Sequence, residues 1–424
     1  MQLRKGNRLL IKEINRNLVL NLIKKHGPIS RAEVARLSNL SAATVSGITA
    51  EFIESDLVRE TGEGESRGGR RPVMLRLNHR ARFVVGVKLM ETAVTCALTD
   101  LDAQVLYHGV TPFAGTEAPV TPETVVAAVI KAVEQTIAES GVDGERLVGI
   151  GLGMAGTVDR AAGIVRYSPF FEWRNVQLAQ PIGDHFQLPV YLENDVNTLT
   201  IAEKWFGYGH DVNDFVVVTV GRGVGAGIVV NGQSYGGASG GAGEFGHIPL
   251  CADGRLRTLE DLASDPALLR DARAALNRGS VHADGQRAAD GQRGEEVSLL
   301  AHAEPLTIEA VFAAADAGDA LARRLLADSG RWLGIGIAAL INILDPRLII
   351  VAGEGVRAGS WRLNAMHEAI EEHTFAGLAG DVEIVVEPSG DETWARGAAC
   401  VVLGDLFRSP AYMEPLRTPG ARPA

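Results

Sequence analysis

The sequence predicts an α/β protein in which a small N-terminal helical module precedes a larger body made of two similar halves. Three observations predict this fold class. The first 80 residues hold 15 Lys and Arg against 8 Asp and Glu, whereas the remainder holds 26 against 44. The basic segment shows helical spacing followed by two strand patterns, and in the acidic segment a pattern of three short strands occurs twice. A basic module on an acidic body indicates that the module binds a polyanion. Chance clustering of charges on a solvated face is the alternative, since it would give the same numbers of basic and acidic residues.

Composition excludes several classes of protein. A chain of 424 residues, 46% of them hydrophobic and 22% charged, allows two or three domains with a sizeable core. The longest apolar runs are about 12 residues, short of the roughly 18 that span a bilayer, and charges interrupt the N-terminus, so neither a membrane protein nor a secretory signal is expected. Three dispersed cysteines without a CxxC pair argue against a cysteine-cluster metal site and fit a reducing cytoplasm.

Three short helices are predicted at the N-terminus. Apolar residues recur at helical spacing over Arg8–His26, and Gly27-Pro28 ends this helix. Ser30–Glu33 matches a capping box that begins a second helix, and Ser41 can cap a third. A helix, a short turn and a further helix form a helix-turn-helix, whose second helix lies in the major groove of DNA. The positions left free of the core near the start of this helix, and expected to contact DNA, are Ser41, Ala43, Thr44 and Ser46.

A β-hairpin is predicted after the third helix. Leu57–Glu60 opens one strand and Pro72–Leu77 returns as the other, with four glycines and three arginines in the run Thr61–Arg71. A flexible cationic hairpin in this place is typical of the wing of a winged helix, and arginines favour a narrow minor groove. A disordered basic linker is the alternative. The wing residues expected to contact DNA are Arg67, Arg70 and Arg71.

The leading turn of the third helix carries no Arg, Asn or Gln, the side chains that make strong bidentate contacts with bases. We therefore expect the wing and an A·T-rich groove to supply much of the sequence preference. Residues 1–80 form the expected domain for binding double-stranded DNA. Such domains generally bind paired operator half-sites, which implies a homodimer or a dimer of dimers.

The acidic body contains the same strand pattern twice. Three short strands joined by tight turns are expected within residues 83–107, and three more within residues 215–235. Each set precedes a helical region and further alternation of strands and helices. A duplicated three-stranded meander with helices is the layout of the two-lobed actin-like, ribonuclease-H-like sugar-kinase fold, whose ligand cleft lies between the halves. A Rossmann fold is the rival, but its glycine run joins a strand to a helix, whereas Gly221–Gly225 joins two strands.

The expected boundaries follow from this pattern. The body covers residues 81–407, with lobes of about 81–200 and 201–407. Residues 408–424 hold four prolines and are expected to form a mobile tail. Residues 277–296 are polar, with four glycines, and are expected to form an exposed insertion.

Five motifs together resemble the ROK family (repressors, open reading frames and kinases), in the repressor branch that includes regulators of xylose and N-acetylglucosamine operons. The resemblance extends over nearly the whole chain, from about residue 7 to about residue 407. The motifs are Gly68–Pro72, Gly153–Asp159, Glu193–Asn197, Gly221–Gly227 and Gly243–His247.

The resemblance implies a sugar site. In family kinases an Asn-Asp pair contacts the sugar, the Asn bonding a hydroxyl and the Asp deprotonating the attacking one, and Asn194 and Asp195 match this pair. Carboxylates and amides suit a sugar because they bind pairs of neutral hydroxyls. The alternative is that Asn194 and Asp195 only cap the following helix. The further residues implied to contact the sugar are Ser168, Glu244, His247 and Glu260.

Two departures from the family bear on chemistry. Kinases carry an Asp-x-Gly-Gly-Thr type loop for ATP phosphates, but the equivalent here is Lys88–Thr92, without glycine and with Glu91, which would repel phosphate. Phosphoryl transfer is therefore expected to be lost. Family members usually place a zinc on one His and three Cys, whereas Cys251 is the only thiol after His247, so we expect no zinc and no other cofactor.

The sequence therefore predicts a cytoplasmic transcription regulator, a repressor of carbohydrate genes, controlled by a small sugar bound without catalysis. One alternative is an active sugar kinase with a DNA-binding extension, and the Lys88–Thr92 loop argues against it. The other is a repressor controlled by a protein partner, with a vestigial cleft.

Overall fold

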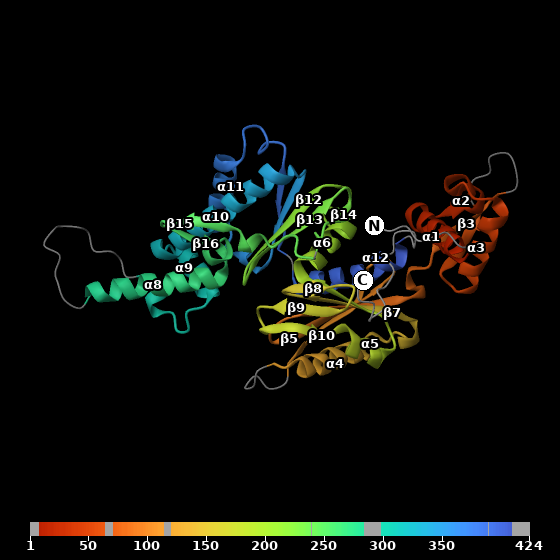
Figure 1. Ribbon diagram of the computed structural model, residues 1–424, viewed down its shortest axis with the longest axis horizontal. Helices are drawn as coiled ribbons and strands as arrows, with labels where there is room; N and C mark the ends of the chain where they lie inside the picture. Colours follow the sequence, from red (N-terminus) through yellow and green to blue (C-terminus); the bar gives the residue numbers. More distant parts are fainter. Residues whose placement is uncertain are drawn as a thin grey trace, which may run out of the picture. The chain divides into compact units, whose positions relative to one another are not determined.

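The computed structural model describes residues 8–63, 71–113, 120–238, 240–283 and 298–388, then Gly390 and residues 391–408. The chain divides into two compact units (Figure 1). The first consists of Met1–Thr198 with Asp391–Ala424, and the second of Leu199–Gly390. No helix in these ranges has both the length and the apolar character that a membrane span requires.

The N-terminal module of the first unit has the predicted three helices and hairpin in order, together with a short strand before α2 that was not predicted. Its helices are α1 (Arg8–His26), α2 (Arg31–Ser38) and α3 (Ala42–Glu54), and its strands are β1 (Ile29–Ser30), β2 (Val58–Glu63) and β3 (Val73–Leu77). The three strands form one sheet in the order β1-β3-β2. The predicted caps are confirmed, because the hydroxyls of Ser30 and Ser41 accept the backbone N–H of Glu33 and Thr44. Apolar residues such as Ile23, Phe52 and Leu75 fill the core.

The rest of the first unit is built on a five-stranded sheet in the order β11-β7-β4-β5-β6. Strands β4, β5 and β6 form the antiparallel meander, and β7 and β11 add parallel to it. The elements are β4 (Phe83–Leu89), β5 (Ala93–Asp100), β6 (Val105–Pro112), β7 (Leu147–Met154), β11 (Val190–Asn194), α4 (Pro122–Ser140), α5 (Ala179–Phe186) and α12 (Asp391–Phe407). A small antiparallel sheet holds β8 (Thr157–Asp159), β9 (Ile164–Ser168) and β10 (Trp173–Gln177).

Helix α12 corrects the expected lobe boundary. The sequence placed residues 391–407 in the second lobe, but α12 packs on β4, β5 and β7 of the first sheet (Figure 1). Two glycines make this contact possible. A Cβ at Gly86 would lie 1.9 Å from the carbonyl oxygen of Ala395, and one at Gly151 would lie 1.8 Å from that of Ala398. The helix backbone therefore lies directly against the sheet.

The second unit repeats the plan. Its sheet has the order β14-β13-β12-β17-β18, with β12, β13 and β14 antiparallel and β17 and β18 parallel to β12. The duplicated meander is thus confirmed. The strands are β12 (Phe215–Val220), β13 (Val224–Val230), β14 (Gln233–Ser234), β15 (Pro249–Ala252), β16 (Arg255–Thr258), β17 (Leu348–Ala352) and β18 (Glu383–Val386). The helices are α7 (Glu260–Ala263), α8 (Asp265–Ala283), α9 (Ile308–Asp316), α10 (Ala320–Leu344) and α11 (Ser360–His373).

The expected insertion and the expected C-terminal tail both extend beyond the described residues. Helix α8 continues to Ala283, so the first part of the expected insertion at 277–296 is helical, while residues 284–296 lie outside the described residues. The expected mobile tail also lies outside them beyond Arg408. Helix α6 (Asp195–Phe206) runs across the boundary between Thr198 and Leu199.

Candidate functional site

The start of α3 presents the residues expected to contact DNA. Ser41, Ala43 and Ser46 are exposed and Thr44 is half-buried, while the opposite face of the helix is buried. The hydroxyl of Ser41 accepts the Thr44 N–H at 3.1 Å and lies 2.8 Å from the Thr44 hydroxyl. Capping therefore holds Ser41 in place, and the structure brings all four positions together on one exposed turn.

Strands β2 and β3 form the base of the predicted wing. Arg71 is exposed just before β3, and its guanidinium lies 3.9 Å from the carboxylate of Glu63 at the end of β2. Arg67 and Arg70 lie outside the described residues, so the tip of the wing remains a prediction.

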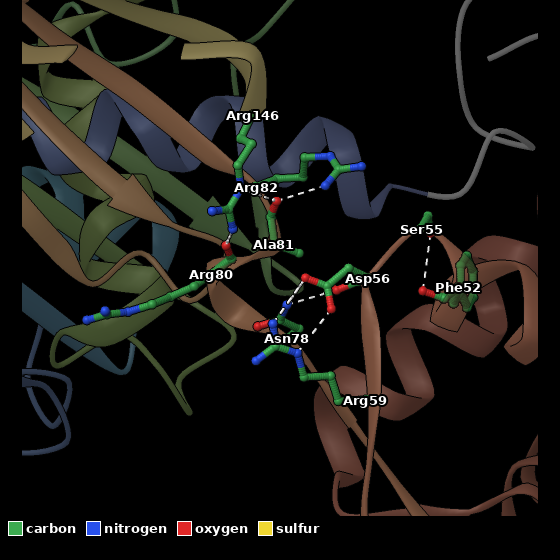
Figure 2. Close-up of polar contacts among 9 residues, drawn as sticks. All are labelled: Phe52, Ser55, Asp56, Arg59, Asn78, Arg80, Ala81, Arg82 and Arg146. Atoms are coloured by element: carbon green, nitrogen blue, oxygen red, sulfur yellow. Dashed lines mark hydrogen bonds and ion pairs between the residues drawn. The ribbon is translucent and has the colours of Figure 1, made fainter. Parts of the chain in front are cut away.

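Polar contacts fix both ends of the short connection between the DNA-binding module and the first sheet, and sequence reasoning missed them. The side-chain amide of Asn78 donates to the backbone carbonyl and to the carboxylate of Asp56, both at 2.9 Å (Figure 2). Asp56 also pairs with Arg59, and this hydrogen bond lowers the pKa of the Asp56 carboxyl. On the other side of the junction, the guanidinium of Arg146 donates to the backbone carbonyls of Arg80 and Ala81 (Figure 2).

Asn194 and Asp195 lie where β11 ends and α6 begins. The Asn194 side-chain oxygen accepts the Asn197 N–H at 3.2 Å, and an Asp195 carboxylate oxygen lies 2.9 Å from the Val196 N–H. The capping alternative is therefore present in the structure for Asn194. Capping uses only the oxygen of the Asn194 amide, whose nitrogen donates to the carbonyl of Gly156 at 3.0 Å.

Ser168 lies beside the same glycine. A Cβ at Gly156 would lie 3.0 Å from the Ser168 Cα, so Ser168 and Asn194 flank Gly156 from two different strands. Ser168 is fully buried, and among the described residues its hydroxyl has no hydrogen-bond partner. A buried hydroxyl without a partner is rare in folded proteins and requires an explanation. The structure thus brings together the three expected sugar contacts of the first unit.

The second unit holds the other three expected sugar contacts. Glu244 precedes a short 3-10 helix, Phe245–His247, and its carboxylate lies 3.8 Å from the His247 imidazole. Glu260, at the start of α7, accepts the Val224 N–H at 2.9 Å, and its Cβ lies 3.3 Å from where a Gly246 Cβ would be. Glu244, His247 and Glu260 are therefore also neighbours.

The residues in place of the family's zinc ligands do not form a cluster. Cys251 is an exposed residue of β15, and within the described ranges no group of three or more His, Cys, Asp and Glu could hold a metal ion. The lack of zinc remains a prediction.

The turn after β4 is the segment that the sequence analysis compares with the ATP loop of kinases. The Met90 N–H donates to the Ala93 carbonyl at 2.9 Å, which closes a tight turn without glycine. Lys88 is nearly buried, forms a 2.7 Å ion pair with Asp391 of α12, and lies 4.4 Å over the Trp394 ring. No sequence pattern predicts this pair, since its partners are separated by 303 positions.

Known proteins that resemble this chain fall into two groups, transcription regulators and sugar kinases. A winged helix-turn-helix DNA-binding model matches residues 13–59. The xylose repressor of Caldicellulosiruptor bescii is 30% identical over 413 residues, which cover 96% of this chain and all of that protein. The DNA-binding transcriptional dual regulator NagC of Escherichia coli is 31% identical, with 94% of each chain covered.

Solved structures show the same two groups. A ROK family transcriptional regulator, a homologue of the E. coli MLC protein, superposes with a TM-score of 0.78 at 29% identity and covers 95% of this chain and 98% of its own. A Streptomyces griseus ROK glucokinase in complex with glucose and AMPPNP gives 0.61 at 26% identity, over 75% of this chain and 98% of its own. The model of the ROK family itself matches residues 84–405, so the chain belongs to the ROK family.

Proposed function

We propose that this protein is a DNA-binding repressor of sugar-metabolism genes, controlled by a sugar that its ROK body binds without phosphorylating. One observation carries the proposal. A winged helix-turn-helix and a ROK body form one chain, of which at least 94% aligns with relatives named xylose repressor and N-acetylglucosamine repressor. A kinase needs only the body, and the glucokinase aligns with only 75% of this chain.

The chemistry of the two clusters supports a sugar as the effector. Sugar hydroxyls both donate and accept hydrogen bonds, so carboxylates, amides and a spare serine hydroxyl suit them. In the first unit, Ser168, whose hydroxyl has no partner among the described residues, lies beside Gly156, the glycine whose carbonyl Asn194 contacts. In the second, Glu244, His247 and Glu260 supply further polar groups.

The turn after β4 supports binding without phosphoryl transfer. ATP phosphates are bound by backbone N–H groups of glycine-rich loops and by cations. Here the turn is closed by its own hydrogen bond, and the ammonium of Lys88 is already paired with Asp391. At this turn the Met90 N–H and the Lys88 ammonium are therefore already engaged within the protein, which disfavours the binding of an ATP phosphate there.

The DNA partner we propose is an operator of paired half-sites bound by a homodimer or a dimer of dimers. The exposed start of α3 offers Ser, Thr and Ala side chains, which make single hydrogen bonds and methyl contacts with bases. Such contacts discriminate weakly, which favours a contribution from the wing and from an A·T-rich minor groove.

DNA binding to the region upstream of the protein's own coding sequence tests the proposal. The measurement is a fluorescence anisotropy titration with and without D-xylose, N-acetyl-D-glucosamine and D-glucose, alongside a coupled ATPase assay with each sugar. A sugar that changes DNA affinity without ATP turnover supports the proposal. Sugar-dependent ATP turnover would instead support the kinase, and DNA binding that no sugar changes would support control by a protein partner.

A further inference from the structure

Glu193, the residue before the Asn-Asp pair, is a buried carboxylate with three donors around it. Only 1% of its surface is exposed. One oxygen accepts the Asn194 N–H at 2.8 Å and the Asn197 side-chain amide at 3.0 Å, and the other lies 2.5 Å from the guanidinium of Arg160. Burial raises the pKa of the Glu193 carboxyl, and Arg160 acts against that rise.

Arg160 comes from the turn between β8 and β9, while Glu193 comes from β11. Strand β9 ends at Ser168 and β11 ends at Asn194. The ion pair therefore joins the two pieces of chain that carry the sugar contacts of the first unit. Asn194 closes the same connection at its other end, through the carbonyl of Gly156 beside Ser168.

We propose that the Arg160–Glu193 ion pair positions Asn194 beside Ser168 for sugar binding, so that Arg160 and Glu193 are positioning residues of this site. The inference rests on the proposed function for its sugar, but its geometry is independent of which sugar binds. A carboxylate is suited to this place because it accepts from Asn194, Asn197 and Arg160 together, whereas a neutral amide offers only one acceptor oxygen.

The buried carboxylate of Glu193 requires a nearby cation, and Arg160 supplies it. A buried carboxylate without a cation is strongly unfavourable and becomes protonated or moves toward water. Either change alters the oxygen that holds Asn194 and Asn197. The Arg160 side chain is 40% exposed and borders a hollow of about 420 Å³, so its replacement by a smaller side chain creates no buried cavity. Arg160→Met therefore removes the charge while the core stays intact.

Arg166 provides a matched control. Its guanidinium pairs with Asp159 at 2.5 Å in the same small sheet, and neither residue has a recorded hydrogen bond to Asn194 or Glu193. Arg160→Met, Arg166→Met and the double variant Arg160→Met/Glu193→Gln are compared with the wild type in the full-length protein. The neutral amide of the double variant needs no cation. It should therefore restore part of the order around Asn194 that is lost in Arg160→Met.

Two readouts separate the inference from the proposed function. Hydrogen exchange of the backbone amides in peptides spanning residues 190–198 needs no sugar. It should be faster in Arg160→Met, unchanged in Arg166→Met and partly restored in the double variant. The second readout is the midpoint at which D-xylose, N-acetyl-D-glucosamine or D-glucose changes DNA affinity. It should rise about tenfold in Arg160→Met, while DNA affinity without sugar stays the same.

Exchange that is unchanged in Arg160→Met would overturn the inference, and so would a wild-type sugar midpoint in that variant. A lack of rescue in the double variant would also contradict it, because loss of the arginine would then act through something other than the buried charge. If exchange accelerates as expected but none of the three sugars acts even on the wild type, the positioning role stands and the proposed choice of effector fails.

Discussion

Asn21 of α1 donates its side-chain amide to the backbone carbonyl of Phe407, the last residue of α12, at 2.8 Å. Asn17, one turn earlier, donates to the carbonyl of Arg408 at 2.9 Å. The last carbonyls of a helix have no partner within it, so two side chains of the DNA-binding module cap the end of α12. The other end of α12 begins with Asp391, which pairs with Lys88.

These contacts give α12 a position from which it can link ligand and DNA. Lys88 lies opposite Gly153 in the sheet, and Asn194 lies opposite Met154, so both are at the same end of the first sheet. Asp391 is also the residue at which the chain passes from the second unit to the first. We therefore expect a change at that end of the sheet to reach α1 through this helix.

The double variant Asn17→Ala/Asn21→Ala is expected to weaken the response to sugar more than it weakens either binding step. Sugar affinity, measured by calorimetry, and DNA affinity without sugar should stay within about twofold, because neither residue belongs to those sites. The ratio of DNA affinities with and without sugar should fall toward one, since a ligand acts only through its preference between two states. Asn342→Ala is the control, because Asn342 donates to the His373 carbonyl at the end of α11 in the second unit. A wild-type ratio in the double variant would show that α12 is not the link.

Lys24 predicts a pH dependence of stability. Its ammonium lies 4.1 Å over the Phe407 ring, yet burial lowers its pKa from 10.5 to about 8, so desolvation outweighs the favourable contact with the ring. At a pH between these two pKa values, Lys24 is protonated in the unfolded chain and has lost its proton in the folded chain. This group therefore makes folding more favourable as the pH rises from 8 to 10.5, and its unfavourable effect is fully present below pH 8.

Lys24→Met should accordingly be more stable than the wild type at pH 7, by about 1 kcal/mol once solvent screening is allowed for. The difference in unfolding free energy, measured by urea denaturation, should shrink as the pH is raised to 10. Lys25→Met, at an exposed neighbour, should show no such trend. A difference that is the same at both pH values would contradict the prediction.

Gly151→Ala tests the close packing of α12 on the first sheet. The new Cβ would lie 1.8 Å from the Ala398 carbonyl oxygen, so the helix must move away, at a loss of about 3 kcal/mol in unfolding free energy. Gly404→Ala, in the same helix, meets nothing within 4 Å and should stabilise the protein by about 0.5–1 kcal/mol. Thermal denaturation of both variants checks the pair, and equal melting temperatures would mean that the helix is not packed as described.

Arg71→Ala tests the base of the wing. If this exposed guanidinium contacts a phosphate, the variant should bind DNA more weakly, and the slope of log affinity against log salt should decrease in magnitude by about 0.9. The exposed Arg357 of the second unit gives a control substitution that should leave the slope unchanged. A wild-type slope in Arg71→Ala would remove this residue from the DNA interface.

The sequence was informative wherever the deciding interactions are local. The caps at Ser30 and Ser41 depend on neighbours three positions away, and the two meanders depend on alternating residues within single hairpins. The packing of α12 depends instead on Gly86 and Gly151, which lie hundreds of positions before it and leave no periodic pattern of their own. The network around the candidate sugar site was hidden for the same reason. Glu193 was read as part of a motif, but no spacing rule connects it with Arg160 in a different turn.

Asp195→Asn tests the ligand role of the Asn-Asp pair. The variant keeps the shape of the side chain and its hydrogen bond to the Val196 N–H, but it removes a charged acceptor. Charge-assisted hydrogen bonds contribute about 1.5–3 kcal/mol, so sugar affinity should fall by roughly tenfold or more. DNA binding without sugar should survive, because the winged helix and the end of β11 are built from separate elements of the first unit. The sugar concentration that changes DNA affinity should therefore rise, whichever direction the change takes. Were the variant to respond at the wild-type midpoint, Asp195 would contribute only to the start of α6, and the role taken from the kinases would not apply at this position.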